Sequence, residues 1–361
     1  MVFDEMTLII IAGGKSSRMG RDKRFIELNG ESLLEIALKK VAAFNFAEII
    51  ISVEAELPEL KMLAARYKAK LVIDERKGRG PLEGLRSALG AMNTERAMVI
   101  SVDTPFLRLE KLAALCDYED FDVVIAESHG RVQPLAGIYR RTFKNVAEKC
   151  LQAGDNKIMQ ALAKVNLKKV PMEITADFFN VNTPAAWRMA RGRAANVNRT
   201  RKILSVTAPA SGTGKTTFIE KLLRNLAEEN INVGVIKSDC HGFNLDHEGK
   251  DSDRFQKAGA ISVAVAAPEG YFLVQKKKNP KENLLGLAEK MEDVAAVIIE
   301  SRTHLFSPCI SLWRGKGEPV ISDEVAVVFA KDLSVDENEI FCFDLDDEER
   351  ALATAKFLLG F

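Results

Sequence analysis

The chain has 361 residues, 47% of them hydrophobic, which is enough for two domains of ordinary size with buried cores. Its 51 basic and 51 acidic residues balance, which argues against a domain held mainly by non-specific attraction to nucleic acid or to an anionic membrane. The five cysteines are scattered and lack CxxC spacing, which predicts reduced thiols and no disulfides. The acidic N-terminus predicts no signal peptide, and no run approaches the roughly 20 apolar residues that span a bilayer. We therefore expect a cytoplasmic protein.

Short β-branched runs alternate with segments of helical period in the first half of the chain. We expect strands at residues 7–12, 47–53, 69–74 and 97–103, and helices at 32–44, 56–67 and 82–92. Because these strands are apolar on both faces, they predict a parallel sheet covered by helices on both sides. A glycine loop and the segment "SVDTP" (101–105) follow strands, at the edge where ligands bind in such folds.

The first glycine loop reads "IAGGKSSRMGRDK" (11–23). Gly13 and Gly14 let the backbone approach a polyphosphate closely, and a following helix would point N–H groups at the anion. Lys15, Arg18 and Lys23 add three positive charges. The loop therefore predicts a phosphate site, and the alternative is an ordinary strand–helix turn with solvated charges.

A basic, polar segment, "WRMARGRAANVNRTRK" (187–202), separates the two halves. It predicts the end of a helix followed by a linker. We therefore expect a first domain at 1–193, a linker at 194–201 and a second domain at 202–361. The alternating pattern then restarts, with apolar runs at 202–209, 231–239, 261–267, 294–300 and 324–330 and helix-like segments at 218–229, 253–260 and 283–291.

The second glycine loop, "APASGTGKTT" (208–217), lies between a strand and a helix, which is the context of a Walker A loop. Pro209 stands where the general pattern has its first glycine. Gly212 and Gly214 would let the backbone approach the phosphates closely. Lys215 would reach the β- and γ-phosphates, and the hydroxyl of Thr216 would bind Mg²⁺. The residues expected to bind nucleotide are Gly212, Thr213, Gly214, Lys215, Thr216 and Thr217.

The first half also resembles a known family. Its loop matches the nucleotidyltransferase signature G-G-x-S-x-R-M-G-x-D-K from Gly13 to Lys23, and "VIDERKGRGPLEGLRSAL" (72–89), "SVDTPFL" (101–107), "QPLAGIY" (133–139) and "FFNVNTP" (178–184) follow in the family's order. On these motifs the half is similar to molybdenum cofactor guanylyltransferases (MobA). The resemblance implies a Rossmann-like nucleotidyltransferase domain, so the fold class expected for the chain is α/β with two doubly wound domains, the second a P-loop NTPase.

The resemblance also implies roles for single residues. Lys23, Arg18 and Asp103 would be catalytic; Asp103 ends an apolar strand, where a carboxylate can hold Mg²⁺, although a strand-end aspartate can also be a helix cap or turn former. Ser52 departs from the asparagine that the family often has at a base or ribose contact. The remaining residues would bind GTP (Ala12, Gly13, Gly14, Lys15, Ser16, Asp74 and Gly84) or face molybdopterin (Gln133 and Asn182).

The second half resembles MobB, the GTP-binding protein that accompanies the guanylyltransferase. Beyond the Walker A loop, the matching positions are Lys237, His241, Asp246, Gly249, Lys250, Asp251 and Ser252. Glu300 would be a metal-binding acid of the Walker B type, and Ser301 replaces the glycine that follows it in the family. The sequence has no guanine-reading N/T-K-x-D motif, so GTP specificity, weak GTPase activity and homodimer formation through this half are implied by the resemblance alone.

The resemblances together imply an enzyme that transfers GMP from GTP to molybdopterin and releases pyrophosphate. Two alternatives stay open: a cytidylyltransferase of the same cofactor, and a C-terminal half that only binds or delivers cofactor. We expect Mg²⁺ as cofactor and, as partners, molybdoenzyme apoproteins or their chaperones and other proteins of molybdenum cofactor synthesis. No partnership with nucleic acid or membrane is expected.

Overall fold

The computed structural model describes residues 3–13, 19, 22–128, 130–172, 176–238, 255, 258–268, 270–275 and 284–361. The contacts within the chain divide it into two units, Met1–Ala190 and Arg191–Phe361, and each is described by itself. The sequence-based limits at 193 and 202 stay a prediction.

The first unit is built on a seven-stranded sheet with the order β5-β4-β1-β6-β8-β7-β9. Four of its strands confirm expected runs and pair in parallel: β1 (Thr7–Ile11), β4 (Glu48–Val53), β5 (Lys70–Ile73) and β6 (Arg96–Ser101). The remaining strands are β7 (Val123–Ser128), β8 (Arg131–Arg140) and β9 (Leu167–Pro171), which is parallel to β7.

Strand β8, which was not among the expected strands, runs antiparallel to both β6 and β7. The reason is local. Strands β7 and β8 pair through Ser128 and Arg131 in a tight hairpin, and Gly130 in its turn has a φ of 71°. Glycine takes this left-handed conformation without steric cost, so the chain reverses here where a parallel strand would need a long crossover.

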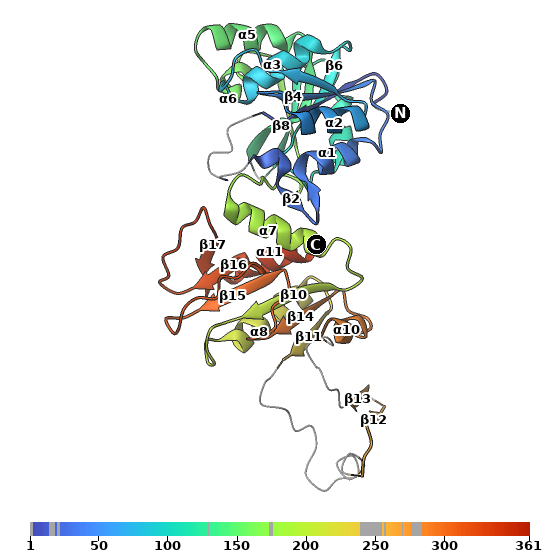
Figure 1. The fold of residues 1–361 in the computed structure, drawn as a ribbon, viewed down its shortest axis with the longest axis vertical. Coiled ribbons are helices and arrows are strands. Elements are labelled where there is room, and N and C mark those ends of the chain that lie inside the picture. The colour runs from blue at the N-terminus through green and yellow to red at the C-terminus, as the bar shows by residue number, and fades with distance from the viewer. Residues whose placement is uncertain are drawn as a thin grey trace. The chain divides into compact units, whose positions relative to one another are not determined.

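Helices cover both faces of this sheet (Figure 1). Helices α1 (Leu33–Val41) and α2 (Pro58–Arg66) lie between β1, β4 and β5 in the chain, whereas α3 (Pro81–Ala91) returns from β5 to β6 on the other face with α5 (Phe143–Gln152). Right-handed crossovers in opposite directions require opposite faces. The unit is thus doubly wound, and the strand order reverses between β1 and β6, where ligands bind in such folds.

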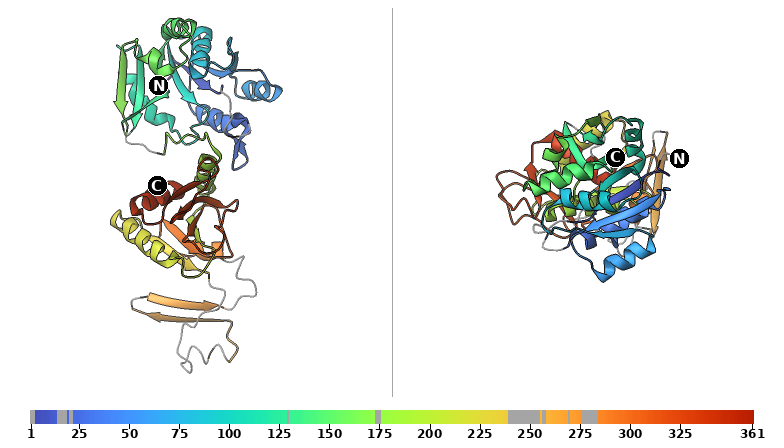
Figure 2. Two further views of the ribbon diagram at one scale, coloured as in Figure 1. Left: turned by 90° about the vertical axis from the view of Figure 1, so that its left-hand side faces the viewer. Right: turned by 90° about the horizontal axis from the view of Figure 1, so that it is seen from above.

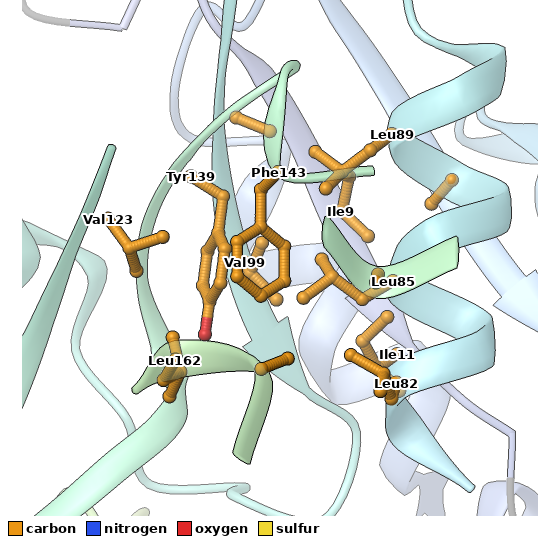
Figure 3. Packing of buried hydrophobic residues seen from close by; sticks show 14 of the residues in the cluster. Ile9, Ile11, Leu82, Leu85, Leu89, Val99, Val123, Tyr139, Phe143 and Leu162 are labelled. Atoms are coloured by element: carbon orange, nitrogen blue, oxygen red, sulfur yellow. The ribbon is translucent and has the colours of Figure 1, made fainter. Parts of the chain in front are cut away.

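One hydrophobic core of this unit lies between the sheet and α3 (Figure 3). Side chains spaced three and four residues apart on α3 face the sheet because the helical period is 3.6 residues. The rings of Tyr139 and Phe143 lie edge to face, with centroids 5.1 Å apart. The cluster includes Ile9, Ile11, Leu82, Leu85, Leu89, Val99, Val123 and Leu162. This packing makes β1 and β6 a rigid base for the loops that follow them.

The second unit has a six-stranded parallel sheet with the order β11-β14-β10-β15-β16-β17. Its strands are β10 (Lys202–Thr207), β11 (Val233–Lys237), β14 (Ala296–Glu300), β15 (Cys309–Trp313), β16 (Val325–Ala330) and β17 (Phe341–Asp344). Helices α8 (Lys215–Glu228) and α11 (Glu348–Leu359) contact each other, and α10 (Leu284–Glu289) packs on residues of β10, β11 and β14. The parallel sheet confirms the expected α/β class.

Two further strands of this unit depart from the expected pattern. The sequence places residues 261–267 in the alternating α/β pattern, but β12 (Ser262–Ala267) pairs antiparallel with β13 (Gly270–Gln275) in a separate two-stranded sheet. The two strands are the opposed orange-brown arrows of Figure 2. The two-residue connection explains the pairing, because such a short loop allows only a hairpin.

Helix α7 (Pro184–Ala195) begins in the first unit and ends in the second. Asn196, at the end of α7 and in the predicted linker, is 1% exposed. Its side-chain amide donates to the carbonyls of Ile203 and Leu358, both at 2.9 Å, and its oxygen accepts from the amide of Ile203 at 2.9 Å. This residue is therefore part of the packed second unit. None of the helices in the described part of the chain is long and apolar enough to cross a membrane.

Candidate functional site

Two residues predicted as catalytic meet at the strand edge of the first unit. Lys23 opens the short 3-10 helix η1 (Lys23–Phe25), and Asp103 lies two residues beyond β6. The ammonium of Lys23 is 3.1 Å from Oδ2 of Asp103, although 80 residues separate them in sequence. The loops after β1 and β6 therefore converge at the point where the strand order reverses.

The second carboxylate oxygen of Asp103 has a different environment. Asp103 is 7% exposed, and its Oδ1 has no hydrogen-bond partner among the described residues. A buried anionic oxygen is costly unless it is paired. Because Mg²⁺ prefers carboxylate oxygens and takes one or two of them while keeping waters, this oxygen fits the predicted metal site. No group of three or more histidine, cysteine or acidic side chains that could hold a metal ion occurs in the described ranges.

A second cluster lies where β4 and β5 end. Asp74 directly follows β5, is 5% exposed, and accepts a 2.8 Å hydrogen bond from the hydroxyl of Ser52. A Cβ on Gly13 would lie 3.2 Å from Oδ2 of Asp74, and one on Gly84 would lie 2.7 Å from Oγ of Ser52. The close approach at Gly84 excludes a larger side chain. Three residues predicted to bind nucleotide, Gly13, Asp74 and Gly84, are therefore neighbours.

Burial raises the pKa of Asp74 to about 6, the Ser52 hydrogen bond opposes this rise, and the charges of Glu83 and Glu54 add to it. Glu83 is itself fully buried and accepts hydrogen bonds from Arg86 at 2.7 Å and from Arg76 at 3.4 Å. This buried ion pair holds the start of α3 beside Asp74. Asp74 is therefore an acid that changes its charge near neutral pH.

Two charged groups also stabilise the loop that carries Asp103, through hydrogen bonds from Lys40 and an ion pair between Arg108 and Asp177. The ammonium of Lys40, on α1, donates to the carbonyls of Pro105 and, at 3.0 Å, Leu107. Burial lowers the pKa of Lys40 to about 8, while the charge of Asp177 raises it. Asp177 is 2% exposed and receives two side-chain hydrogen bonds from Arg108, at 2.9 and 2.8 Å.

Other predicted residues of this half are less well connected. Ala12 lies between β1 and Gly13, and its amide donates to the carbonyl of Ser52 at 2.9 Å. Asn182 is exposed. The amide of its neighbour Val181 donates to the carbonyl of Asp103 at 2.8 Å. Gln133 is half-buried on β8. Neither side chain hydrogen-bonds to the two clusters within the described ranges. The predicted residues Gly14, Lys15, Ser16 and Arg18 lie outside the described residues, as do His241, Asp246, Gly249, Lys250, Asp251 and Ser252 of the second half.

The Walker A loop has the expected geometry. Gly212 and Gly214 have φ values of 71° and 95°, and Gly214 is the left-handed residue that starts α8. Only glycine takes such angles freely, so the backbone amides can turn toward a phosphate at the helix N-terminus. The hydroxyl of Thr213 donates to the carbonyl of Ala210 at 2.8 Å and closes the loop.

A cavity of about 570 Å³ opens in front of this loop. Lys215, Thr216 and Thr217 line it together with Lys237 at the end of β11 and Glu300 at the end of β14. The strand register explains this grouping, because Glu300 pairs with Val206 of β10 on one side and with Lys237 on the other. Burial lowers the pKa of Lys215, and the charge of Glu300 partly offsets this effect. The predicted P-loop residues and Glu300 thus share one cavity.

Sequence reasoning missed three groups that the structure places at these sites: Lys40, Glu83 and Arg302. Arg302 lines the P-loop cavity two residues beyond Glu300. Its position after a strand-end acid was the available signal. Lys40 and Glu83 lie within amphipathic helices, where a charged residue normally indicates a solvated face, so no sequence signal marks them as wholly or partly buried.

Two family models match the chain. Residues 8–168 match MobA-like NTP transferase domains, and residues 203–332 match molybdopterin guanine dinucleotide synthesis protein B. A probable molybdenum cofactor guanylyltransferase from Geobacillus sp. (strain WCH70) is 34% identical over 190 residues, covering 50% of this chain and 95% of that protein. A protein of the same description from Carboxydothermus hydrogenoformans is 31% identical over 188 residues, covering 50% and 92%.

Among solved structures, molybdopterin-guanine dinucleotide biosynthesis protein A from Archaeoglobus fulgidus is 26% identical. The similarity covers 52% of this chain and 97% of that chain, with a TM-score of 0.45.

Proposed function

Because the chain belongs to the molybdenum cofactor guanylyltransferase family, with a MobA-like domain in its first half and a MobB domain in its second, we propose that it transfers GMP from GTP to molybdopterin. In this reaction an oxygen of the molybdopterin phosphate attacks the α-phosphorus of GTP. The bond between the α-phosphorus and the bridging oxygen breaks, and pyrophosphate leaves with the electron pair.

The observation that carries this proposal is the contact between Lys23 and Asp103 at the reversal of the strand order. Phosphoryl and nucleotidyl transfer need alignment and charge neutralisation more than covalent help from the protein. Lys23 offers a cation to the charge that grows on the α-phosphate and the leaving pyrophosphate. Asp103, through its unpaired Oδ1, would hold Mg²⁺. A bound Mg²⁺ supplies further neutralisation of phosphate charge.

Asp74 and Gly84 would bind the base and ribose of GTP, and Gly13, beside them, would approach its phosphates. The support is their proximity: an added Cβ on Gly13 would lie 3.2 Å from Oδ2 of Asp74, and one on Gly84 would lie 3.6 Å from Oδ1. An ionised carboxylate accepts hydrogen bonds from the donors that a guanine base or a ribose hydroxyl presents. Gln133 and Asn182 are assigned to the molybdopterin side by resemblance.

The second domain would bind GTP through the Walker A loop and assist synthesis or delivery of the cofactor. The support is the cavity that joins Lys215 and Thr216 to Glu300. GTP hydrolysis, homodimer formation through this domain, and delivery to molybdoenzyme apoproteins or their chaperones stay predictions.

One assay tests the transfer reaction and separates the alternatives. The full chain is incubated with molybdopterin, Mg²⁺ and GTP, CTP or ATP, and release of pyrophosphate and formation of the dinucleotide are measured. We expect turnover with GTP. A preference for CTP would identify a cytidylyltransferase, and an absence of transfer with all three nucleotides would leave the chain as a binding or delivery protein.

A further inference from the structure

Arg302 stands in a rigid turn at the P-loop cavity. Ser301, before it, is 1% exposed; its amide donates to the carbonyl of Val206 at 3.1 Å, and its hydroxyl accepts from the amide of His304 at 2.9 Å. The first bond ties the backbone before Arg302 to strand β10, and the second closes the turn from Ser301 to His304 around Arg302. The Arg302 side chain is exposed and lines the cavity. A fixed backbone thus presents a solvent-accessible guanidinium to the nucleotide site.

The present contacts of this guanidinium are weak. One nitrogen lies 3.3 Å from the hydroxyl of Ser211 and another lies 3.4 Å from the carbonyl of Pro209, both in the first part of the P-loop. Both distances are at the long end for hydrogen bonds, and both acceptors are neutral. A guanidinium has five donors in a planar fork that suits a phosphate. No ion pair joins Arg302 to a carboxylate in the part of the chain that the structure describes. Among the described residues, the contacts of Arg302 therefore include no charged acceptor.

The charges around the cavity favour an anion. Lys215, Lys237 and Arg302 line the cavity, and Glu300 is the single carboxylate among the lining residues that the structure describes. After burial, the charges of Arg302 and Lys237 are the causes that lower the pKa of Lys215, so the three cations are close enough to repel one another. Three positive charges against one negative charge are stabilised by a polyphosphate, which brings several negative charges.

The space beside the P-loop differs between its two sides. A second cavity shares Gly214 and Thr217 with the first and continues along α8 and α11, where Arg314 and Asp346 line it. Arg314 follows β15 and Asp346 follows β17, on one side of the P-loop strand β10, whereas Arg302 follows β14 on the other side. The second cavity, at about 30 Å³, has room for little more than a water molecule, whereas the cavity lined by Lys215 and Arg302 has about 570 Å³. A phosphate chain held by the P-loop therefore has room on the β14 side, where Arg302 lies.

We propose that Arg302 binds the γ-phosphate of the nucleoside triphosphate in the P-loop site, in exchange for its contacts to Ser211 and Pro209, so that the second domain distinguishes a triphosphate from a diphosphate. This inference rests on the proposed function, because the nucleotide is the GTP assigned to that domain. The β-phosphate stays with the P-loop amides and Lys215. A diphosphate therefore gains nothing from Arg302.

Equilibrium binding to the full chain tests this assignment. Fluorescent GDP and a fluorescent GTP analogue with an imido group between the β- and γ-phosphates are titrated without molybdopterin. The first domain can also bind nucleotide, so the signal that survives in Lys215→Ala is subtracted throughout. We expect Arg302→Ala to weaken binding of the triphosphate analogue about tenfold or more, as for the loss of charge-assisted hydrogen bonds, and to change GDP binding less than about twofold.

Two further variants sharpen the readout. Arg302→Lys keeps a point charge and should recover part of the triphosphate affinity. Arg224→Ala removes an exposed arginine on α8 and should leave both affinities unchanged. Equal effects of Arg302→Ala on the two nucleotides, or no effect on either, would overturn the γ-phosphate assignment alone. A lack of any Lys215-dependent binding would overturn it together with the GTP-binding role of the second domain, and the transfer assay reports separately on the first domain.

Discussion

The hydroxyl of Ser52 lies 2.8 Å from Oδ1 of Asp74 and donates a hydrogen bond to it in a buried position. Ser52 ends up beside Asp74 because β4 and β5 pair in parallel, with Ser52 opposite Val72 and Val53 opposite Ile73. The resemblance marks Ser52 as a departure from a base or ribose contact. The structure instead shows it holding the carboxylate that is proposed to make such a contact.

The pH dependence of GMP transfer should show the ionisation of Asp74 and the effect of the Ser52 hydrogen bond on it. Burial raises the pKa of Asp74 from 3.8 to about 6, so the carboxylate accepts hydrogen bonds from the nucleotide only above that pH. We expect kcat/KM for GTP to fall as the pH drops below about 6, and Asp74→Asn to lack this part of the profile. Because the Ser52 hydrogen bond lowers the pKa of Asp74, Ser52→Ala should move the decline to higher pH. Identical profiles for Asp74→Asn and the unmodified chain would contradict the assignment.

Alanine substitution at two glycines of α3 should change the stability of the protein in opposite directions. A Cβ on Gly84 would lie 2.7 Å from Oγ of Ser52, so Gly84→Ala must displace Ser52 or the helix and disturb Asp74. We expect a loss of GTP affinity and of stability, by about 1–3 kcal/mol as for overpacking of a core.

The control is Gly90→Ala, because Gly90 lies on the same helix with nothing within 4 Å of its added Cβ. Alanine should stabilise the helix by up to about 1 kcal/mol and leave transfer unchanged. Thermal unfolding and GTP titration measure both effects. A Gly84→Ala variant with unchanged GTP affinity would show that this edge does not contact the nucleotide.

Substitutions at the two nucleotide sites should have different effects on the rate of GMP transfer. Asp103→Ala removes the carboxylate paired with Lys23 and the proposed metal ligand, so we expect transfer to fall at least 100-fold, about the cost of one strong transition-state contact. Lys215→Ala changes only the P-loop and should leave a substantial part of transfer. Pyrophosphate release from the two variants is the measurement. A complete loss of transfer in Lys215→Ala would place the chemistry in the second half.

Much of the fold follows from sequence because both domains have buried parallel strands separated by helices. Strands such as β1 and β6 are apolar on both faces, and only a sheet covered on both sides buries them. The antiparallel hairpin of β7 and β8 could not be predicted from the hydrophobic pattern, because the direction of a strand depends on the length of its connection and not on hydrophobicity. Strand β15, the run Cys309–Trp313, was not among the expected strands.

The site follows from sequence only where a local motif carries it. Gly13 and Asp103 lie two residues beyond β1 and β6, and the P-loop glycines lie in the loop after β10, so the chain order already places each at the carboxyl edge of its own sheet. The partner of Asp74 and the γ-phosphate position of Arg302 depend on which strands are neighbours in the sheet. That order is a property of the tertiary fold, so no spacing in the sequence reports it.

Adjacent lysines on α1 provide the last prediction. Lys40 is half-buried and its ammonium contacts the carbonyls of Pro105 and Leu107, in the loop that carries Asp103, whereas Lys39 is paired on the surface with Glu31 at 2.7 Å. Lys40→Met leaves two carbonyls without their donor and should cost about 1–3 kcal/mol of stability and lower kcat more than it raises KM for GTP. Lys39→Met should stay within about 0.5 kcal/mol of the unmodified chain.

The pH dependence of stability separates this bracing role from a general loss of packing. The folded pKa of Lys40, about 8, lies below its ordinary value of 10.5, so between these pH values the unfolded chain binds more protons than the folded one. The unmodified chain therefore gains stability relative to Lys40→Met as the pH rises from about 8 to 10.5. Chemical unfolding at several pH values measures the gap. A gap that stays constant over this range would mean that Lys40 is not partly buried as an amine against the loop of Asp103.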